Sequence, residues 1–163
     1  MKRTILSIAM ALCVSCMPGQ SNEVYKLSKI KGVQSIHFDK NMITNMIDKE
    51  MEWEEGPLIL DFDFLKDKES TLDDIQIYSC QEKKAANKLK KTVSKLLLNK
   101  NQYQELININ RDGTAIKAYC RKEGNQNSFI IFGDGNNEEE IYTTLVIIKG
   151  NLDITTWLNS ENY

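Results

Sequence analysis

Hydrophobic residues recur along the chain with two different periods, which predict strands and helices in alternation. Residues 33–38 alternate weakly between apolar and polar positions and end at Asp39, a residue type that often caps a helix. A spacing of three and four residues follows and predicts a short amphipathic helix. Its apolar positions are Met42, Ile43, Met46, Ile47 and Met51. We expect Gly56-Pro57 to close this region and the acidic segment 58–72 to be a long connection.

The clearest helical pattern spans Glu82–Lys100, directly after an expected strand over residues 75–80. Apolar positions form one stripe and lysines line the opposite side. The stripe consists of Ala85, Ala86, Leu89, Val93, Leu96 and Leu97, and the lysines are Lys84, Lys88, Lys91 and Lys95. The pattern predicts a surface helix whose apolar side packs against a sheet.

Four strands without a helical interruption are expected after this helix. The first two flank Asp112-Gly113, the strongest short signal for a hairpin. With these two residues as the loop, Arg111 pairs with Thr114, Ile109 with Ile116, Ile107 with Ala118, and Asn108 with Lys117. Apolar residues then meet across the strands, which supports this register. Two further strands are expected at 128–132 and 141–149, separated by a turn at 133–139.

This order predicts an α+β fold with a largely antiparallel sheet of about six strands. We expect two main helices on one face of the sheet and a short C-terminal helix that begins at Asp153. The length of 163 residues suits one domain, which we assign to residues 32–163, preceded by a tether at 21–31.

Residues 1–20 have the features of an export signal. Lys2 and Arg3 precede twelve mostly apolar residues, too few for the ~20 that a membrane-spanning helix needs. Val14-Ser15-Cys16 resembles the end of a bacterial lipobox, in which the cysteine is acylated and becomes the new N-terminus, although Cys13 stands where Leu is usual. The alternative is ordinary cleavage near residue 20. We favour acylation at Cys16, because Met17 and Pro18 are not the small residues that ordinary signal-peptide cleavage prefers.

Charge is distributed unevenly along the chain. Removal of Lys2 and Arg3 leaves 19 basic and 23 acidic residues, which argues against a nucleic-acid-binding protein. Residues 48–74 carry eleven acidic residues and three lysines, whereas residues 83–100 carry seven lysines and no acidic residue. The two segments are either solvated surfaces or a pair of docking sites for a partner protein or a second copy of the chain. The lysine-rich segment could also contact anionic lipid headgroups.

Few residues can carry catalytic or metal chemistry. His37 is the only histidine, and no sequence feature brings Cys80 or Cys120 to it as a nucleophilic pair. Asp134, Asn136 and Glu138 match three positions of a calcium loop, but Glu139 and Leu145 replace its glycine and bidentate glutamate, which favours a polar turn. We therefore assign no catalytic, cofactor-binding or metal-binding residue.

Cys80 and Cys120 are the only possible disulfide partners within the domain after cleavage of the signal, and export exposes them to an oxidising compartment. The hairpin register places Cys120 on the core face with Ile116 and Ala118. Cys80 alternates with Ile75, Ile77 and Ser79 and should point the other way. Because diverging side chains cannot be bridged without backbone movement, we expect free thiols and a buried Cys120.

Three stretches carry a resemblance to a known family. They are Gly32-Val33-Gln34-Ser35-Ile36, the helix from Ala85 to Leu97 that leads into Tyr103-Gln104-Glu105-Leu106, and Lys149-Gly150-Asn151-Leu152-Asp153-Ile154. The chain resembles the domain of unknown function 4252 family over most of residues 24–158. The resemblance implies a small exported or lipid-anchored envelope protein of Bacteroidota-type bacteria, loosely associated with envelope and signalling genes. It implies no active site.

The functional expectation is a non-enzymatic interaction or sensing module, held at the outer membrane by a lipid on Cys16 and facing the periplasm. A protein partner could bind through Lys84, Lys88, Lys91 and Lys95; the oligomeric state stays open. The alternative is a small soluble periplasmic or secreted hydrolase or ligand-binding domain, with a site built from scattered acidic residues.

Overall fold

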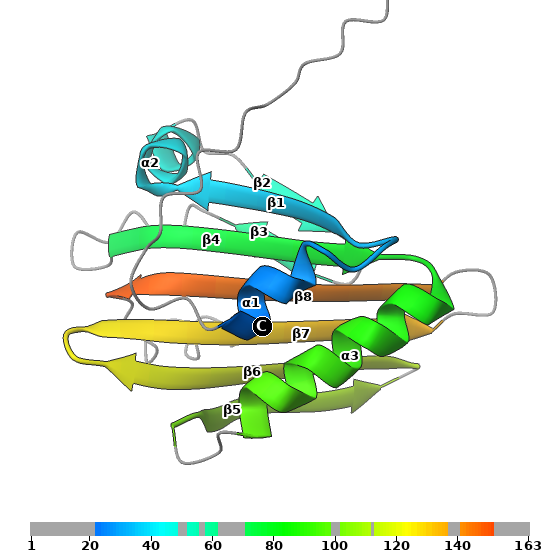
Figure 1. Cartoon of the computed structure of the whole chain (residues 1–163). Helices are drawn as coiled ribbons and strands as arrows, with labels where there is room; N and C mark the ends of the chain where they lie inside the picture. Colours follow the sequence, from blue (N-terminus) through cyan, green and yellow to red (C-terminus); the bar gives the residue numbers. More distant parts are fainter. Residues whose placement is uncertain are drawn as a thin grey trace, which may run out of the picture.

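A six-stranded antiparallel sheet forms the centre of the structure, with its strands in the order β1-β4-β8-β7-β6-β5 (Figure 1). The computed structural model describes residues 22–48, 52–55, 58–61, 71–98, 102–111, 113–136 and 141–151. The strands of the sheet are β1 (Gln34–Asp39), β4 (Thr71–Cys80), β5 (Gln104–Arg111), β6 (Thr114–Glu123), β7 (Gln126–Asn136) and β8 (Ile141–Asn151). The helices are α1 (Asn22–Leu27), α2 (Lys40–Asp48) and α3 (Lys83–Leu98), and β2 (Glu52–Glu55) pairs with β3 (Leu58–Asp61) in a separate two-stranded sheet.

The α+β fold class and the antiparallel six-stranded sheet predicted from the sequence are confirmed. Strands β5 to β8 are neighbours in chain order, as expected for successive hairpins. Three strands separate β4 from β5 in the sheet, so the connection between them has to cross the sheet. Helix α3 makes this crossing over one face (Figure 1).

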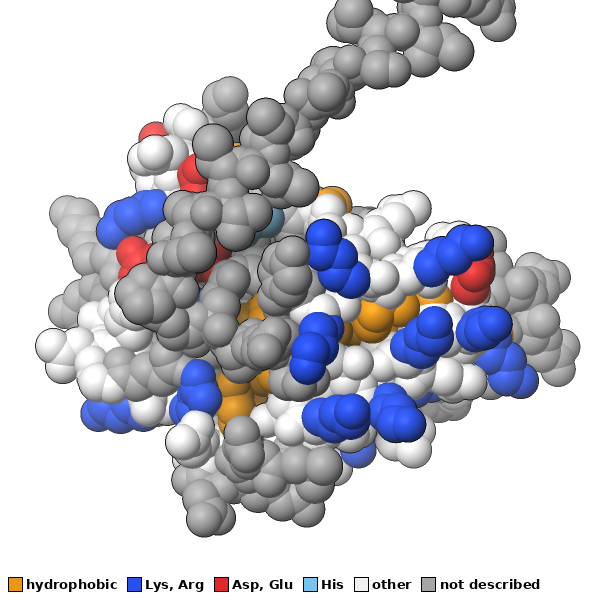
Figure 2. Space-filling view, viewed as in Figure 1, with side chains coloured by type: hydrophobic (Ala, Val, Ile, Leu, Met, Phe, Trp, Pro, Cys, Tyr) orange, Lys and Arg blue, Asp and Glu red, His pale blue; other side chains and the backbone are white. Residues whose placement is uncertain are grey.

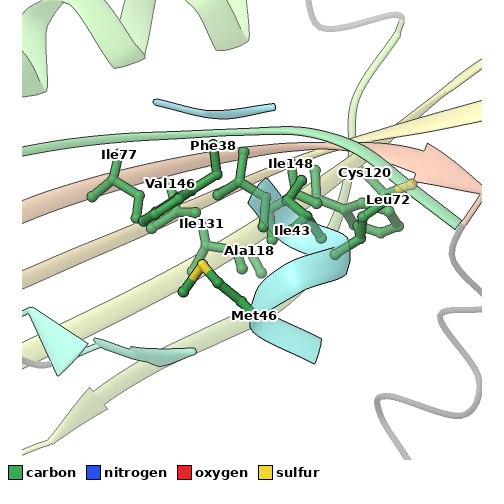
Figure 3. Close-up of a cluster of buried hydrophobic side chains, with 12 residues drawn as sticks. Phe38, Ile43, Met46, Leu72, Ile77, Ala118, Cys120, Ile131, Val146 and Ile148 are labelled. Carbon is green, nitrogen blue, oxygen red and sulfur yellow. The ribbon is translucent and has the colours of Figure 1, made fainter. Parts of the chain in front are cut away.

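Each face of the sheet has its own hydrophobic core. Along β8, Val146 and Ile148 point to the face that carries α2, which we call the α2 face, and Leu145 and Ile147 point to the opposite α3 face. The α2-face core consists of Phe38, Ile43, Met46, Leu72, Ile75, Ile77, Ala118, Cys120, Phe129, Ile131, Val146 and Ile148 (Figure 3). The α3-face core consists of Leu27, Tyr78, Cys80, Ala85, Ala86, Leu89, Val93, Leu96, Ile130, Leu145 and Ile147.

The two main helices therefore lie on opposite faces, and the expectation that both cover one face is wrong. The physical reason is the uninterrupted apolar run of β8, which is buried on both sides and needs a cover on each. Helices α1 and α3 lie in front of the sheet in Figure 1, and β2 and β3 lie behind it.

The predicted hairpin between β5 and β6 is confirmed residue by residue. Ile109 pairs with Ile116 and Ile107 with Ala118, and a register shift between Glu105 and Ile107 follows further along. Gly113 has a φ of +79°, a conformation that glycine adopts without steric cost.

The described residues before α3 contain more helix and strand than the sequence predicts. Asn22–Leu27 of the expected tether forms α1, because Leu27 is completely buried in the α3-face core. The acidic connection contains strand β3, paired with β2, and β4 begins at Thr71 rather than at residue 75. Helix α2 begins where predicted, since the Asp39 carboxylate accepts a hydrogen bond of 2.9 Å from the backbone amide of Met42.

Strand β7 also extends beyond its prediction. Residues 133–136, expected in a turn, continue the strand to Asn136 and pair with both β6 and β8. The expected helix at Asp153 lies outside the described residues. Among the residues that are described, no helix is both long enough and apolar enough to span a membrane.

Candidate functional site

Helix α3 presents the four predicted lysines to solvent along one side. Lys84, Lys88, Lys91 and Lys95 are all exposed, and we call them the lysine face. The opposite side of the helix is buried, with Leu89 completely inaccessible. The predicted division of this helix into an apolar and a basic side is confirmed, and Figure 2 shows basic side chains distributed along α3.

The turn that follows α1 extends the same surface. Lys31 is exposed, and the next residue, Gly32, has a φ of +87°. A Cβ atom at Gly32 would lie 3.2 Å from the Cβ of Ala85 and 3.1 Å from Oε2 of Glu82, so this turn lies directly against the first turn of α3. Leu27 anchors α1 in the same core as α3. The two helices therefore share one surface.

An ion pair holds α3 in register with the sheet. Lys90 Nζ lies 2.6 Å from Oδ2 of Asp134 on β7, and the Thr143 hydroxyl donates a hydrogen bond of 2.8 Å to Oδ1 of the same carboxylate. This contact points Lys90 toward the sheet, in contrast to the lysines of the lysine face. Both carboxylate oxygens of Asp134 are engaged within the protein.

Cys80 is a buried thiol beside this ion pair. Its side chain contacts the carbonyl oxygen of Thr143 at 3.8 Å, and only 4% of the residue is exposed. Burial raises the pKa of the Cys80 thiol; the carboxylates of Asp134 and Glu82 add to this effect and Lys90 opposes it. The thiol is therefore protonated at neutral pH and is a poor nucleophile.

His37 lies too far along the sheet to activate Cys80. His37 pairs with Gln76, four residues before Cys80 on β4, which corresponds to ~13 Å along the strand. Cys120 is buried on the α2 face (Figure 3), whereas Cys80 is on the α3 face, and both thiols are free, as predicted from the register. Burial raises the pKa of Cys120 as well.

A chain of hydrogen-bonded polar side chains runs along the α3 face of β4. His37 Nε2 contacts Oδ1 of Asp74, and the Gln76 amide donates a hydrogen bond of 2.7 Å to Oδ2 of the same carboxylate. The Tyr78 hydroxyl donates to Oε1 of Gln76 at 2.9 Å. The three β4 side chains are buried, whereas the His37 side chain is 56% exposed. Burial, followed by the Asp74 charge, raises the pKa of Tyr78 to about 12.

This polar chain was not predicted, although the sequence contains its signal. Asp74, Gln76 and Tyr78 alternate with Ile75 and Ile77, so a two-residue period places them on one face. Each polar group has a partner within the chain, which makes it a structural network that joins edge strand β1 to β4 rather than a site open to substrate.

A cleft of about 280 Å³ lies where β1 begins and β4 ends. Its titratable side chains are those of Cys80, Glu82 and Tyr142. Within the described ranges, no three His, Cys, Asp or Glu side chains gather as metal ligands. The residues that line the cleft are Gly32, Val33, Gln34, Ser79, Cys80, Gln81, Glu82, Tyr142 and Thr144.

The family model described as Domain of unknown function (DUF4252) matches residues 25–157. The chain belongs to this family. The match confirms the resemblance found in the sequence, and it covers every described strand and helix α3. No curated protein matches the chain. Cys16, the predicted acylation site, lies outside the described residues.

Proposed function

We propose that this member of the DUF4252 family is an exported envelope lipoprotein that acts by binding rather than by catalysis, with the lysine face as its binding surface. The proposal has two parts, an anchor at Cys16 and a binding surface on α3. They rest on different observations and are tested separately.

The anchor is supported by the sequence. A short basic segment and twelve mostly apolar residues lead directly into Val14-Ser15-Cys16. A diacylglyceryl group together with an N-acyl chain exceeds the two signals that stable membrane attachment requires. The first acidic residue after the cysteine is Glu23, so we propose attachment to the outer membrane with the domain facing the periplasm.

The observation that carries the binding role is the lysine face. Four exposed cations lie on one side of α3, and none of them forms an ion pair with a carboxylate of the described residues. Lys90, by contrast, has its structural partner in Asp134. Helix α3 thus carries one lysine that pairs with the sheet and four lysines that remain available to a ligand.

The placement of the titratable groups also favours binding over catalysis. Cys80 is buried and protonated, and His37 contacts Asp74 instead of a thiol. Turnover of ester, glycoside or peptide substrates by the purified protein would contradict the non-enzymatic part of this proposal.

The anchor is tested by metabolic labelling with a radioactive fatty acid, followed by separation of membrane and soluble fractions. We expect label in the wild-type protein, and loss of label and of stable membrane attachment in Cys16→Ala. Cys13→Ala is the matched control, because it removes a thiol from the same leader and should keep the label. Wild-type protein without label would show that the anchor is absent.

A further inference from the structure

We infer that the ligand of the lysine face is the anionic headgroup surface of the membrane that holds the anchor. The inference deepens the proposed function and rests on acylation of Cys16. It follows from three properties of the molecule: the reach of the anchor, the placement of positive charge, and the burial of the apolar side of α3.

The anchor places α1 close to the membrane. Six residue steps separate Cys16 from Asn22, where α1 begins, and this length of chain spans at most ~22 Å. Helix α1 is held on the α3 face by Leu27, and the turn at Gly32 contacts the first turn of α3. The face of the sheet that carries α1 and α3 is therefore the face that the anchor keeps near the lipid.

Positive charge is concentrated on this same face. Seven exposed lysines lie on α3 and on the turn that follows α1, namely Lys29, Lys31, Lys83, Lys84, Lys88, Lys91 and Lys95. Figure 2 shows basic side chains across this surface, and acidic side chains near α2 and also beside the basic ones at the right-hand end of the view. The chain from Cys16 onward carries 19 basic and 23 acidic residues, so its attraction to an anionic membrane depends on presenting this face.

The mode of contact follows from the packing of α3. Its apolar stripe is buried against the sheet, so the helix cannot insert into the acyl region as an amphipathic membrane helix does. Contact is then made by the lysine ammonium groups alone. Each lysine at an anionic surface contributes about fivefold to binding, and this contribution is lost when salt shortens the screening length.

The experiment uses the acylated protein reconstituted into vesicles of phosphatidylcholine, or of an equal mixture of phosphatidylcholine and phosphatidylglycerol. Flotation with phosphatidylcholine vesicles reports the anchor alone. Lysines are then modified with an amine-reactive acetylating reagent, and the rate at each lysine is measured by mass spectrometry. We expect Lys91 and Lys95 to react at least about fivefold more slowly on the anionic vesicles, and to lose this protection in about 1 M NaCl.

Two double variants with equal loss of charge distinguish this face from the rest of the protein. Lys84→Gln with Lys88→Gln should remove most of the protection at Lys91 and Lys95. Lys40→Gln with Lys122→Gln should leave it unchanged, because Lys40 begins α2 and Lys122 follows Cys120 at the two-residue spacing of the α2 face. Equal effects of the two variants would overturn the inference.

The remaining outcomes are distinguishable. Failure to float with phosphatidylcholine vesicles would refute the anchor, and with it the inference that depends on it. Flotation with equal labelling of the lysines on both kinds of vesicle would refute only the docking of the lysine face.

Discussion

The packing of α3 against the sheet leads to the sharpest stability prediction, the effect of Leu89→Ala. Leu89 is completely inaccessible and belongs to the same core as Leu145 and Ile147 of β8. Truncation to Ala removes three carbon atoms, which corresponds to about 2.4 kcal/mol of transfer free energy at about 0.8 kcal/mol per methylene. The cavity left in a sheet-backed site adds to this loss, so we expect a decrease of about 3–4 kcal/mol in the free energy of unfolding.

Urea denaturation of the purified protein, followed by far-ultraviolet circular dichroism, measures this decrease. Lys91→Ala is the matched control on the opposite side of the same helix and should change stability by less than about 0.5 kcal/mol, since Ala and Lys have similar helix propensities. A loss below about 1 kcal/mol for Leu89→Ala, or an equal loss for the two variants, would show that the buried side of α3 is assigned wrongly.

Three further predictions test the interior and the turns. The pKa of Tyr78 is near 10 in the unfolded chain and about 12 in the folded protein, so the free energy of unfolding should fall by about 2–3 kcal/mol as pH rises from 10 to 12. Urea titrations at several pH values measure this loss, and Tyr78→Phe should reduce it. Cys80 and Cys120 should resist maleimide in the native protein and both react after denaturation without reductant; failure of both to react would reveal a disulfide. Gly32→Ala should lower the melting temperature more than Gly124→Ala, because both glycines have positive φ but only a Cβ at Gly32 would meet neighbours within 4 Å. Equal melting temperatures of the two variants would contradict the close contact at Gly32.

The parts of the fold that were predictable are those set by local periodicity and turn chemistry. The α3 stripe and the β5–β6 register follow from patterns within about twenty residues, and both agree with the structure. The opposite orientation of Cys80 and Cys120 follows from the same two-residue period. These features depend on neighbouring residues and little on the rest of the molecule.

The remainder depends on contacts between distant segments. The apolar run Leu145–Ile148 of β8 is consistent with burial on both sides, but it does not indicate which helix covers which face, so the expectation that both main helices share one face is wrong. Leu27 appears in a polar stretch, and only its burial against α3 gives α1 a reason to form. The Lys90–Asp134 pair joins residues 44 positions apart. The helical period places Lys90 away from the lysine face, but no local pattern identifies Asp134 as its partner.

The central claim, that this is a lipid-anchored protein with its lysine face held at the membrane, depends first on the mature N-terminus. Mass spectrometry of the N-terminal peptide from the membrane fraction measures this end directly. We expect a peptide that begins at Cys16 and carries a diacylglyceryl group and an N-acyl chain. An unmodified peptide that begins near residue 20 would contradict it.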